Sequence, residues 1–198
     1  MSTEKNIHPI FQKLVQRDER EKLLSQKAKV IWMTGLSGSG KSTLAIGLER
    51  TLHDAGKLAY VLDGDNVRAG INNNLGFSEE DRTENIRRVA EVAKLLVDSG
   101  VIVICSFVSP TRDIRALAKN IIGEKDFLEV YVNASLAECE KRDVKGLYRK
   151  ARAGEIKDFT GIHQPFEAPE KPSLEINTEN NSLEDSLKKL LEFVNKNS

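Results

Sequence analysis

The sequence contains little cysteine, and its charges cancel. Cys105 and Cys139 are its only cysteines, and neither has a second cysteine or a histidine at the spacing of a zinc site. We expect two buried thiols in a reducing compartment. The 30 basic and 30 acidic residues balance, so net charge does not support a nucleic-acid or membrane partner, and we expect neither.

Long apolar runs and a secretory leader are also missing. No run approaches the roughly 20 apolar residues of a membrane span, and the N-terminus is polar with mixed charge. We therefore expect a cytoplasmic protein. The 198 residues contain no repeat and are enough for one sizeable domain with its own core.

Short apolar runs alternate with segments that have helical spacing. Strands are predicted at 29–34, 58–63, 101–107, 127–132 and 173–177. Helices are predicted at 41–56, 78–100, 111–121, 134–142 and from 182 onward. This alternation indicates an α/β fold with a parallel sheet, in which ligands bind beyond the C-terminal ends of the strands.

The two ends of the domain differ from its middle. Residues 1–28 are predicted to be an N-terminal helical extension, in which Ile10, Phe11, Leu14 and Val15 have the spacing of a short amphipathic helix. Residues 29–198 would form the main domain. Residues 143–172 are rich in glycine, proline and charge, and we expect a loop there.

A glycine-rich segment, GLSGSGKST at 35–43, stands between the first predicted strand and the first helix. It matches the P-loop (Walker A) pattern, in which glycines allow backbone N–H groups to converge on a phosphate. The lysine reaches the outer phosphates and the serine hydroxyl binds Mg²⁺. A chance glycine-rich turn is the weaker alternative. The predicted nucleotide-binding residues are Gly35, Ser37, Gly38, Ser39, Gly40, Lys41, Ser42 and Thr43.

Two carboxylates, Asp63 and Asp65, follow in LDGDNVR at 62–68. Side chains alternate along a strand, so a strand end would carry both acids on one side. We expect this strand to lie next to the strand of the phosphate loop. Asp63, with Ser42, is predicted to hold Mg²⁺, and Asp65 to orient or deprotonate a substrate hydroxyl, although coupled acids can exchange such roles. An acidic turn is the alternative.

Several arginines could grip a second anion. Arg82 and Asn85 share the buried stripe of the long predicted helix, and Arg68 lies shortly before it. Arg87 and Arg88 are more simply interpreted as solvated residues or partners of neighbouring glutamates.

The basic segment 145–161 is either a charged surface loop or a lid that excludes water from bound phosphates. Phe159 lies inside it and Phe77 just before the long helix. Each ring could stack on a base or pack in the core.

Together these motifs resemble the adenylyl-sulfate (APS) kinase family. The resemblance spans about residues 29–178 and rests on GLSGSGKST, LDGDNVR, GFSEEDRTENIRR, SFVSP and DVKGLYRKARAGEIKDFTGI. It implies a P-loop NTPase-like three-layer fold with a central, mainly parallel, five-stranded sheet and a lid at about 145–161. It also implies that ATP, with Mg²⁺, phosphorylates the ribose 3′-hydroxyl of adenosine 5′-phosphosulfate (APS). The products would be 3′-phospho-APS (PAPS) and ADP, in sulfate assimilation, and the protein would commonly be a homodimer.

The resemblance also assigns roles to residues. Ribose and phosphosulfate would be held by Asp65, Arg68, Arg82 and Asn85, and the adenine of APS by Phe77 and Phe159. Lys145, Val108 and Ser109 would also contact the substrate. Ser109 matches a serine described in the family as a phosphoserine intermediate; direct in-line transfer, with Ser109 as a positioning group, is the alternative. The catalytic set would be Lys41, Asp63, Asp65 and Ser109.

Two other functions remain open from the sequence. One is another P-loop small-molecule or nucleotide kinase. The other is a nucleotide-dependent switch, but the Asn-Lys-x-Asp base-reading motif of GTPase switches is absent from the sequence.

Overall fold

A five-stranded parallel sheet forms the centre of the protein. The computed structural model describes residues 6–197. The strands are β1 (Val30–Thr34), β2 (Ala59–Asp63), β3 (Ile102–Ser106), β4 (Phe127–Asn133) and β5 (Leu174–Asn177), in the order β2-β3-β1-β4-β5. All five predicted strands are present, and the α/β fold with a parallel sheet is confirmed.

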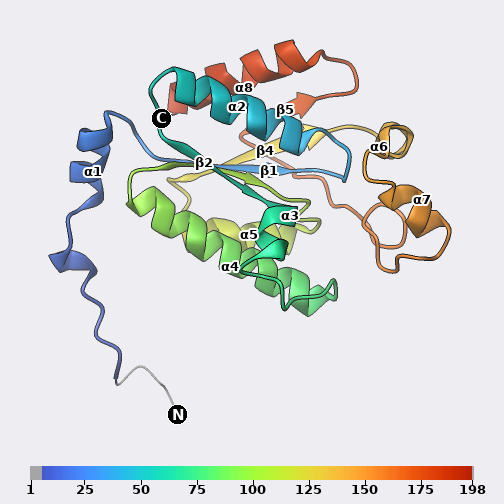
Figure 1. Ribbon diagram of the computed structural model, residues 1–198, viewed down its shortest axis with the longest axis horizontal. Helices are drawn as coiled ribbons and strands as arrows, with labels where there is room; N and C mark the ends of the chain where they lie inside the picture. Colours follow the sequence, from blue (N-terminus) through green and yellow to red (C-terminus); the bar gives the residue numbers. More distant parts are fainter. Residues whose placement is uncertain (1–5, 198) are drawn as a thin grey trace.

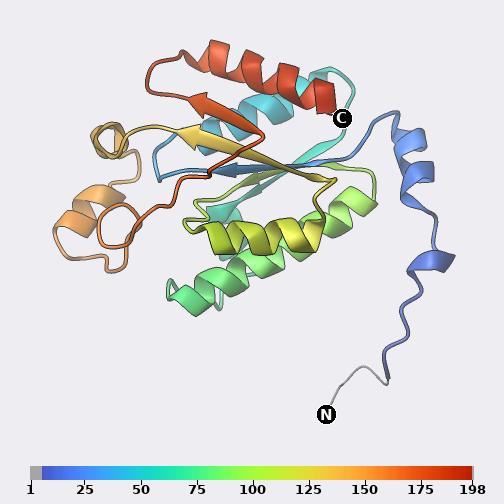
Figure 2. The ribbon, with the colours of Figure 1, turned by 180° about the vertical axis from the view of Figure 1, so that it is seen from behind.

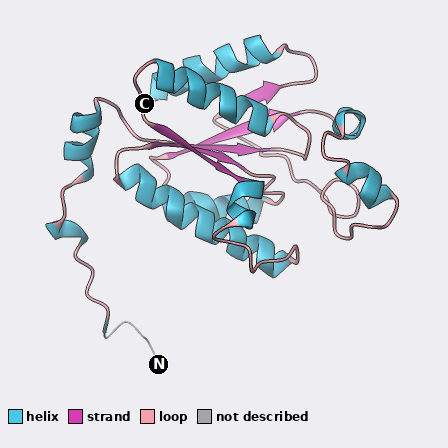
Figure 3. Ribbon diagram, in the orientation of Figure 1, coloured by secondary structure: helices cyan, strands magenta, loops and turns pink. Residues whose placement is uncertain are grey.

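Helices cover both faces of this sheet, which gives three layers. Helices α2 (Lys41–Asp54) and α8 (Leu183–Asn197) lie on one face, and α4 (Glu79–Asp98) and α5 (Arg112–Ile122) on the other (Figures 1 and 2). The shorter helices α3 (Gly64–Ala69), α6 (Leu136–Arg142) and α7 (Leu147–Arg152) gather near the C-terminal ends of the strands (Figure 3). This is the edge at which parallel sheets bind ligands.

The central strand divides the core into two clusters. Val30 and Trp32 pack with the side chains of α4 and α5, and Ile31 and Met33 pack with those of α2 and α8. Successive strand residues point to opposite faces, so a strand covered on both sides is apolar throughout. All five residues of β1 are buried, which fixes the loop that follows it on a rigid support.

The position and form of the acidic segment differ from the prediction. Strand β3 lies between β1 and β2, so Asp63 does not end a strand next to that of the phosphate loop. Nor do the two acids share a strand end, because the strand stops at Asp63 and α3 begins at Gly64. The Asp63 Oδ1 atom caps this helix by accepting a hydrogen bond from the Asp65 backbone N–H at 3.0 Å.

Two other local predictions are correct only in part. The expected loop at 143–172 contains α7, which begins because both carboxylate oxygens of Asp143 accept backbone N–H groups, from Tyr148 and Arg149. The expected amphipathic helix near Phe11 is only a short 3₁₀ turn, η2 (Phe11–Lys13), and the Phe11 side chain is 67% exposed. A short helix without packing partners is marginal in water.

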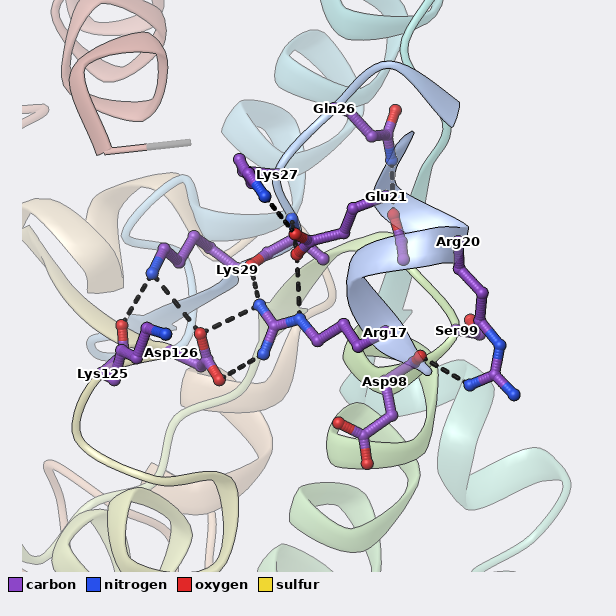
Figure 4. A network of polar contacts seen from close by, with 12 residues as sticks. Arg17, Arg20, Glu21, Gln26, Lys27, Lys29, Asp98, Ser99, Lys125 and Asp126 are labelled. Carbon is purple, nitrogen blue, oxygen red and sulfur yellow. Dashed lines mark hydrogen bonds and ion pairs between the residues drawn. The ribbon is translucent and has the colours of Figure 1, made fainter. Parts of the chain in front are cut away.

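The helix of the N-terminal extension forms later, as α1 (Arg17–Leu24), and polar contacts attach it to the sheet (Figure 4). The Arg17 guanidinium pairs with both carboxylate oxygens of Asp126 and donates to the Ala28 carbonyl at 2.6 Å. Glu21 accepts from Arg17, Lys27 and the Ala28 backbone, and these donors hold the pKa of its carboxyl at about 2 despite its burial. Charge pairing therefore positions this helix.

Both cysteines are buried and unpaired, as expected, and burial raises the pKa of each thiol. Within residues 6–197, no helix is both long and apolar enough to cross a lipid bilayer.

Candidate active site

The phosphate loop follows β1 directly and leads into α2. Two of its glycines cannot be replaced without strain. A Cβ atom at Gly35 would lie 2.4 Å from the Val132 carbonyl oxygen, and Gly40 has a φ of +99°, which L-residues rarely adopt. These positions turn the chain so that its N–H groups converge at the start of α2, where the helix dipole also favours an anion.

The backbone carbonyls of residues 35–39 in the loop all accept hydrogen bonds from side chains. The carbonyls of Gly35 and Leu36 accept from Lys41 Nζ at 2.8 and 2.7 Å. The next three, in residues 37–39, accept in turn from the Tyr148 hydroxyl at 2.9 Å, Arg142 Nη1 at 3.3 Å and the Thr178 hydroxyl at 2.7 Å. Because side chains satisfy these carbonyls, the loop has a fixed shape. Its N–H groups can face a phosphate, apart from that of Ser39, which donates to the Leu36 carbonyl at 3.1 Å.

Lys41 lies inside the loop and is only 7% exposed. Burial lowers the pKa of its ammonium group to about 8, an effect to which Lys145 adds and which Asp63 opposes. A cation that has lost most of its water interacts strongly with an incoming anion.

Ser42 and Asp63 form the candidate metal site. The Ser42 hydroxyl donates to Asp63 Oδ2 at 2.8 Å and lies 3.3 Å from the Ser106 hydroxyl. In the described part of the chain, no cluster of three or more His, Cys, Asp or Glu side chains could hold a metal by itself. The oxygen donors of this small set fit Mg²⁺, which keeps several waters and uses few protein ligands.

Asp65 and Lys145 are in direct contact. The Lys145 ammonium forms an ion pair with Asp65 Oδ2, and both side chains are more than half exposed. The pair therefore links α3 to the start of the basic segment 145–161. It also places a carboxylate and an ammonium where they can reach one substrate.

Arg68 and Arg82 have no carboxylate partner among the described residues. Arg68 donates to the Leu75 and Gly76 carbonyls and lies 4.3 Å from the centre of the Phe77 ring. Arg82 donates to the Phe77 carbonyl at 2.8 Å. Burial lowers the pKa of both guanidinium groups, and the charge of Arg82 adds to this effect at Arg68. Two such cations in one wall favour an anion there.

Arg87 and Arg88 behave differently, because both pair with Glu84, at 2.7 and 2.8 Å. This confirms the prediction of ion pairs with a neighbouring glutamate.

Segment 145–161 folds over the cavity and contacts both sides of it. Arg82 donates to the Thr160 hydroxyl at 2.9 Å and also bonds the Asp158 carbonyl. At the phosphate loop, the Tyr148 hydroxyl of the segment donates to the Ser37 carbonyl at 2.9 Å. Within the segment, the Tyr148 ring packs edge-on against Phe159, with ring centres 5.1 Å apart. The segment thus bridges the phosphate loop and α4.

Ser109 is held in a constrained loop. Its φ is +38°, in the left-handed region that is unfavourable for a residue with a side chain. Its hydroxyl accepts from the Trp32 indole N–H at 3.2 Å, and its carbonyl accepts from Arg115 at 2.8 Å. Within residues 6–197 no carboxylate or imidazole bonds this hydroxyl, so the geometry favours a positioning group over a nucleophile.

A single cavity of about 800 Å³ brings these groups together. All of the predicted substrate-binding residues line it: Asp65, Arg68, Phe77, Arg82, Asn85, Val108, Ser109, Lys145 and Phe159. So do six of the predicted phosphate-loop residues, whereas Gly35 and Ser39 lie behind its wall. The sequence pattern did not single out Arg142, Tyr148 or Thr178, because each is recognisable only by the loop carbonyl that it reaches.

Comparison with known proteins gives a consistent family. The family model described as Adenylylsulphate kinase matches residues 27–177. The adenylyl-sulfate kinase of Bacteroides fragilis is 61% identical over 194 residues, which cover 98% of this chain and 96% of that protein. The adenylyl-sulfate kinase of Clostridium kluyveri is 55% identical over 181 residues, which cover 91% of this chain and 90% of that protein.

Solved structures agree. The Mycobacterium tuberculosis APS kinase CysC in complex with AMPPNP and APS superposes with a TM-score of 0.82 at 46% identity, covering 85% of this chain and 98% of that one. A gluconokinase from Sinorhizobium meliloti, at 15% identity and a TM-score of 0.58, shares the fold alone. The match extends over most of the chain, and the phosphate loop and the cavity agree with it: the chain belongs to the adenylyl-sulfate kinase family.

Proposed function

We propose that the chain transfers the γ-phosphoryl group of ATP to the ribose 3′-hydroxyl of APS, which gives PAPS and ADP. The observation that carries the proposal is that two sets of groups line one cavity. Lys41, Ser42 and Asp63, which suit phosphate and Mg²⁺, line the same cavity as Asp65 and the arginines at 68 and 82. The M. tuberculosis relative was solved with both AMPPNP and APS bound.

The chain's own residues would perform most of the reaction by positioning and charge. The phosphate-loop N–H groups and Lys41 bind the phosphates and stabilise the charge of the transferring group. Bound Mg²⁺, held through Ser42 and Asp63, would supply further positive charge there. Asp65 orients the substrate hydroxyl and accepts its proton, and Ser109 holds the neighbouring loop in place.

The lid and the aromatic rings would bind the rest of the substrate. Arg68 and Arg82 hold the phosphosulfate, and Phe77 and Phe159 hold the adenine. The segment that carries Lys145 and Phe159 excludes water, which would otherwise hydrolyse ATP.

The test is the product of incubation with ATP, Mg²⁺ and one acceptor at a time. APS, AMP, adenosine and gluconate are compared, and products are separated by anion-exchange chromatography. We expect PAPS and stoichiometric ADP only with APS. A faster reaction with any other acceptor would favour another small-molecule kinase. Slow hydrolysis that no acceptor stimulates would favour a nucleotide switch.

Three further features are part of the proposal. We propose a homodimer, a cytoplasmic location, and a domain boundary near residue 28. Sedimentation of the purified protein would measure the first. Truncation at residue 28 would test the boundary, and the contacts of Arg17 with Asp126 lead us to expect reduced stability with the cavity intact.

A further inference from the structure

Two buried amides meet where α4 passes the turn that follows α3. The Asn72 side chain is completely buried, and Asn85 is 5% exposed and lines the cavity. Asn72 Nδ2 lies 3.0 Å from Asn85 Oδ1 and 3.4 Å from the main-chain oxygen of Asn85. Asn72 was not among the residues that the sequence singled out.

The main-chain oxygen fixes the direction of both amides. A carbonyl oxygen only accepts hydrogen bonds, so the Asn72 atom that faces it must be the nitrogen. The same nitrogen faces the Asn85 side chain, and the atom it meets there must be the oxygen. The Asn85 Nδ2 group therefore points away from Asn72. This group has no hydrogen-bond partner among residues 6–197. It is not one of the fully buried, unpaired polar atoms of that range, so it remains accessible.

The arrangement has a cost at its buried end. The Asn72 Oδ1 atom is buried without a partner in the described part of the chain. A buried acceptor without a donor is unfavourable, and each such group in a native structure calls for an explanation. The presence of this amide, despite its unpaired oxygen, is explained if its nitrogen is needed to orient the Asn85 side chain.

We propose that Asn72 is a positioning residue that turns the Asn85 amide so that its N–H donors face the substrate. The inference rests on the proposed function and specifies the chemistry of the same site. The substrate group beside Asn85 must be a hydrogen-bond acceptor. Arg68 and Arg82 line the same cavity and are also pure donors. Because two of these donors are cations, this wall favours an oxyanion, as in a phosphosulfate, over a neutral hydroxyl or an ammonium group.

Hydrogen exchange of side-chain amides tests the orientation without any ligand. The two Nδ2 resonances are assigned in the full-length protein by their loss in Asn72→Asp and Asn85→Asp. We expect slow exchange for the Asn72 amide protons and fast exchange for those of Asn85. Slow exchange at Asn85 in the wild-type protein would overturn the proposal, whatever the enzyme's acceptor is.

Kinetics test the role of Asn72, with Asn72→Leu as the variant and Asn73→Leu as the matched control. Leucine keeps the shape of the buried side chain, and Asn73 is an exposed neighbour in the same turn. We expect Asn72→Leu to raise the KM for APS about fivefold or more, the effect of one lost hydrogen bond. The KM for ATP and the urea midpoint should stay near those of the control.

An unchanged KM for APS in Asn72→Leu would overturn the positioning role. Equal increases in both KM values, with a lower urea midpoint, would also overturn it, because they would show that Asn72 only supports the fold. Failure of the proposed function is separate, since it would appear as a wild-type protein that does not phosphorylate APS.

Discussion

Replacing Lys41 by methionine should abolish most activity without weakening the fold. The ammonium group is 7% exposed, and burial lowers its pKa to about 8 from the ordinary value of 10.5. This difference corresponds to about 3 kcal/mol of folding free energy that the charged lysine costs at pH 7. Its two hydrogen bonds to loop carbonyls offset about 2 kcal/mol of that cost. Lys41→Met should therefore be as stable as the wild type or about 1 kcal/mol more stable.

The sign of the pH dependence follows from the lowered pKa. Below pH 8 both the folded and the unfolded chain hold the proton, so the full cost is present. Between about pH 8 and 10.5 the folded chain releases the proton first, so this residue's contribution makes the wild type more stable as pH rises. The methionine variant lacks this rise.

Urea unfolding, with EDTA and without nucleotide, measures the stability of the variant and the pH dependence of the wild type. The control is Lys94→Met, on the exposed side of α4. Turnover with saturating ATP and APS should fall by a factor of about 10²–10³, as when one preorganised transition-state donor is removed. The reasoning fails if Lys41→Met is more than about 2 kcal/mol less stable than the wild type. It also fails if its turnover stays within about tenfold of normal.

Three further substitutions test other parts of the site. Arg82→Met should raise the KM for APS about tenfold or more, because it removes a proposed donor to the phosphosulfate and a contact with the lid. ATP binding, measured by calorimetry, should change little. Arg87→Met is the control, and a similar change in both variants would contradict the assignment. Arg115→Met should lower the unfolding free energy by about 3 kcal/mol, because the guanidinium is 3% exposed and bonds Glu129; a loss below about 1 kcal/mol in urea would disagree. Tyr148→Phe should weaken ATP binding about fivefold, because the Ser37 carbonyl loses its donor; exposed Tyr60→Phe should not, and equal affinities would exclude the effect.

The sequence predicts the sheet well because its strands are short apolar runs covered on both faces. It also predicts α4, since Ser78 caps the helix at Asp81 N–H and the stripe through Ile86 and Val89 is buried. These features depend on neighbouring residues alone. The order of the strands does not, and for that reason the position of β3 between β1 and β2 was not foreseen.

The residues of the site were predictable only where the chemistry is local to a motif. The phosphate loop is one such motif. The acids at 63 and 65 could be predicted from it, because Mg²⁺ that binds with the phosphates needs a carboxylate nearby. The supports of the loop were not found. Tyr148 and Thr178 lie 111 and 139 residues from the carbonyls that they reach, and no spacing rule connects positions so far apart. Asn72 was not found either, although it lies only 13 residues from Asn85, because its contact with that residue depends on how the turn after α3 packs against α4.

The position of β3 sets a length scale for the chemistry. Neighbouring strands are about 4.8 Å apart, so two spacings separate the ends of β1 and β2 by about 10 Å. The Ser106 hydroxyl at the end of β3 occupies the middle of this interval, 3.3 Å from Ser42. The strand order thus sets the distance between the phosphate loop, which follows β1, and the acidic segment, which follows β2. If β1 and β2 were adjacent, their ends would be only about 4.8 Å apart, and there would be no place between them for the Ser106 hydroxyl that contacts Ser42.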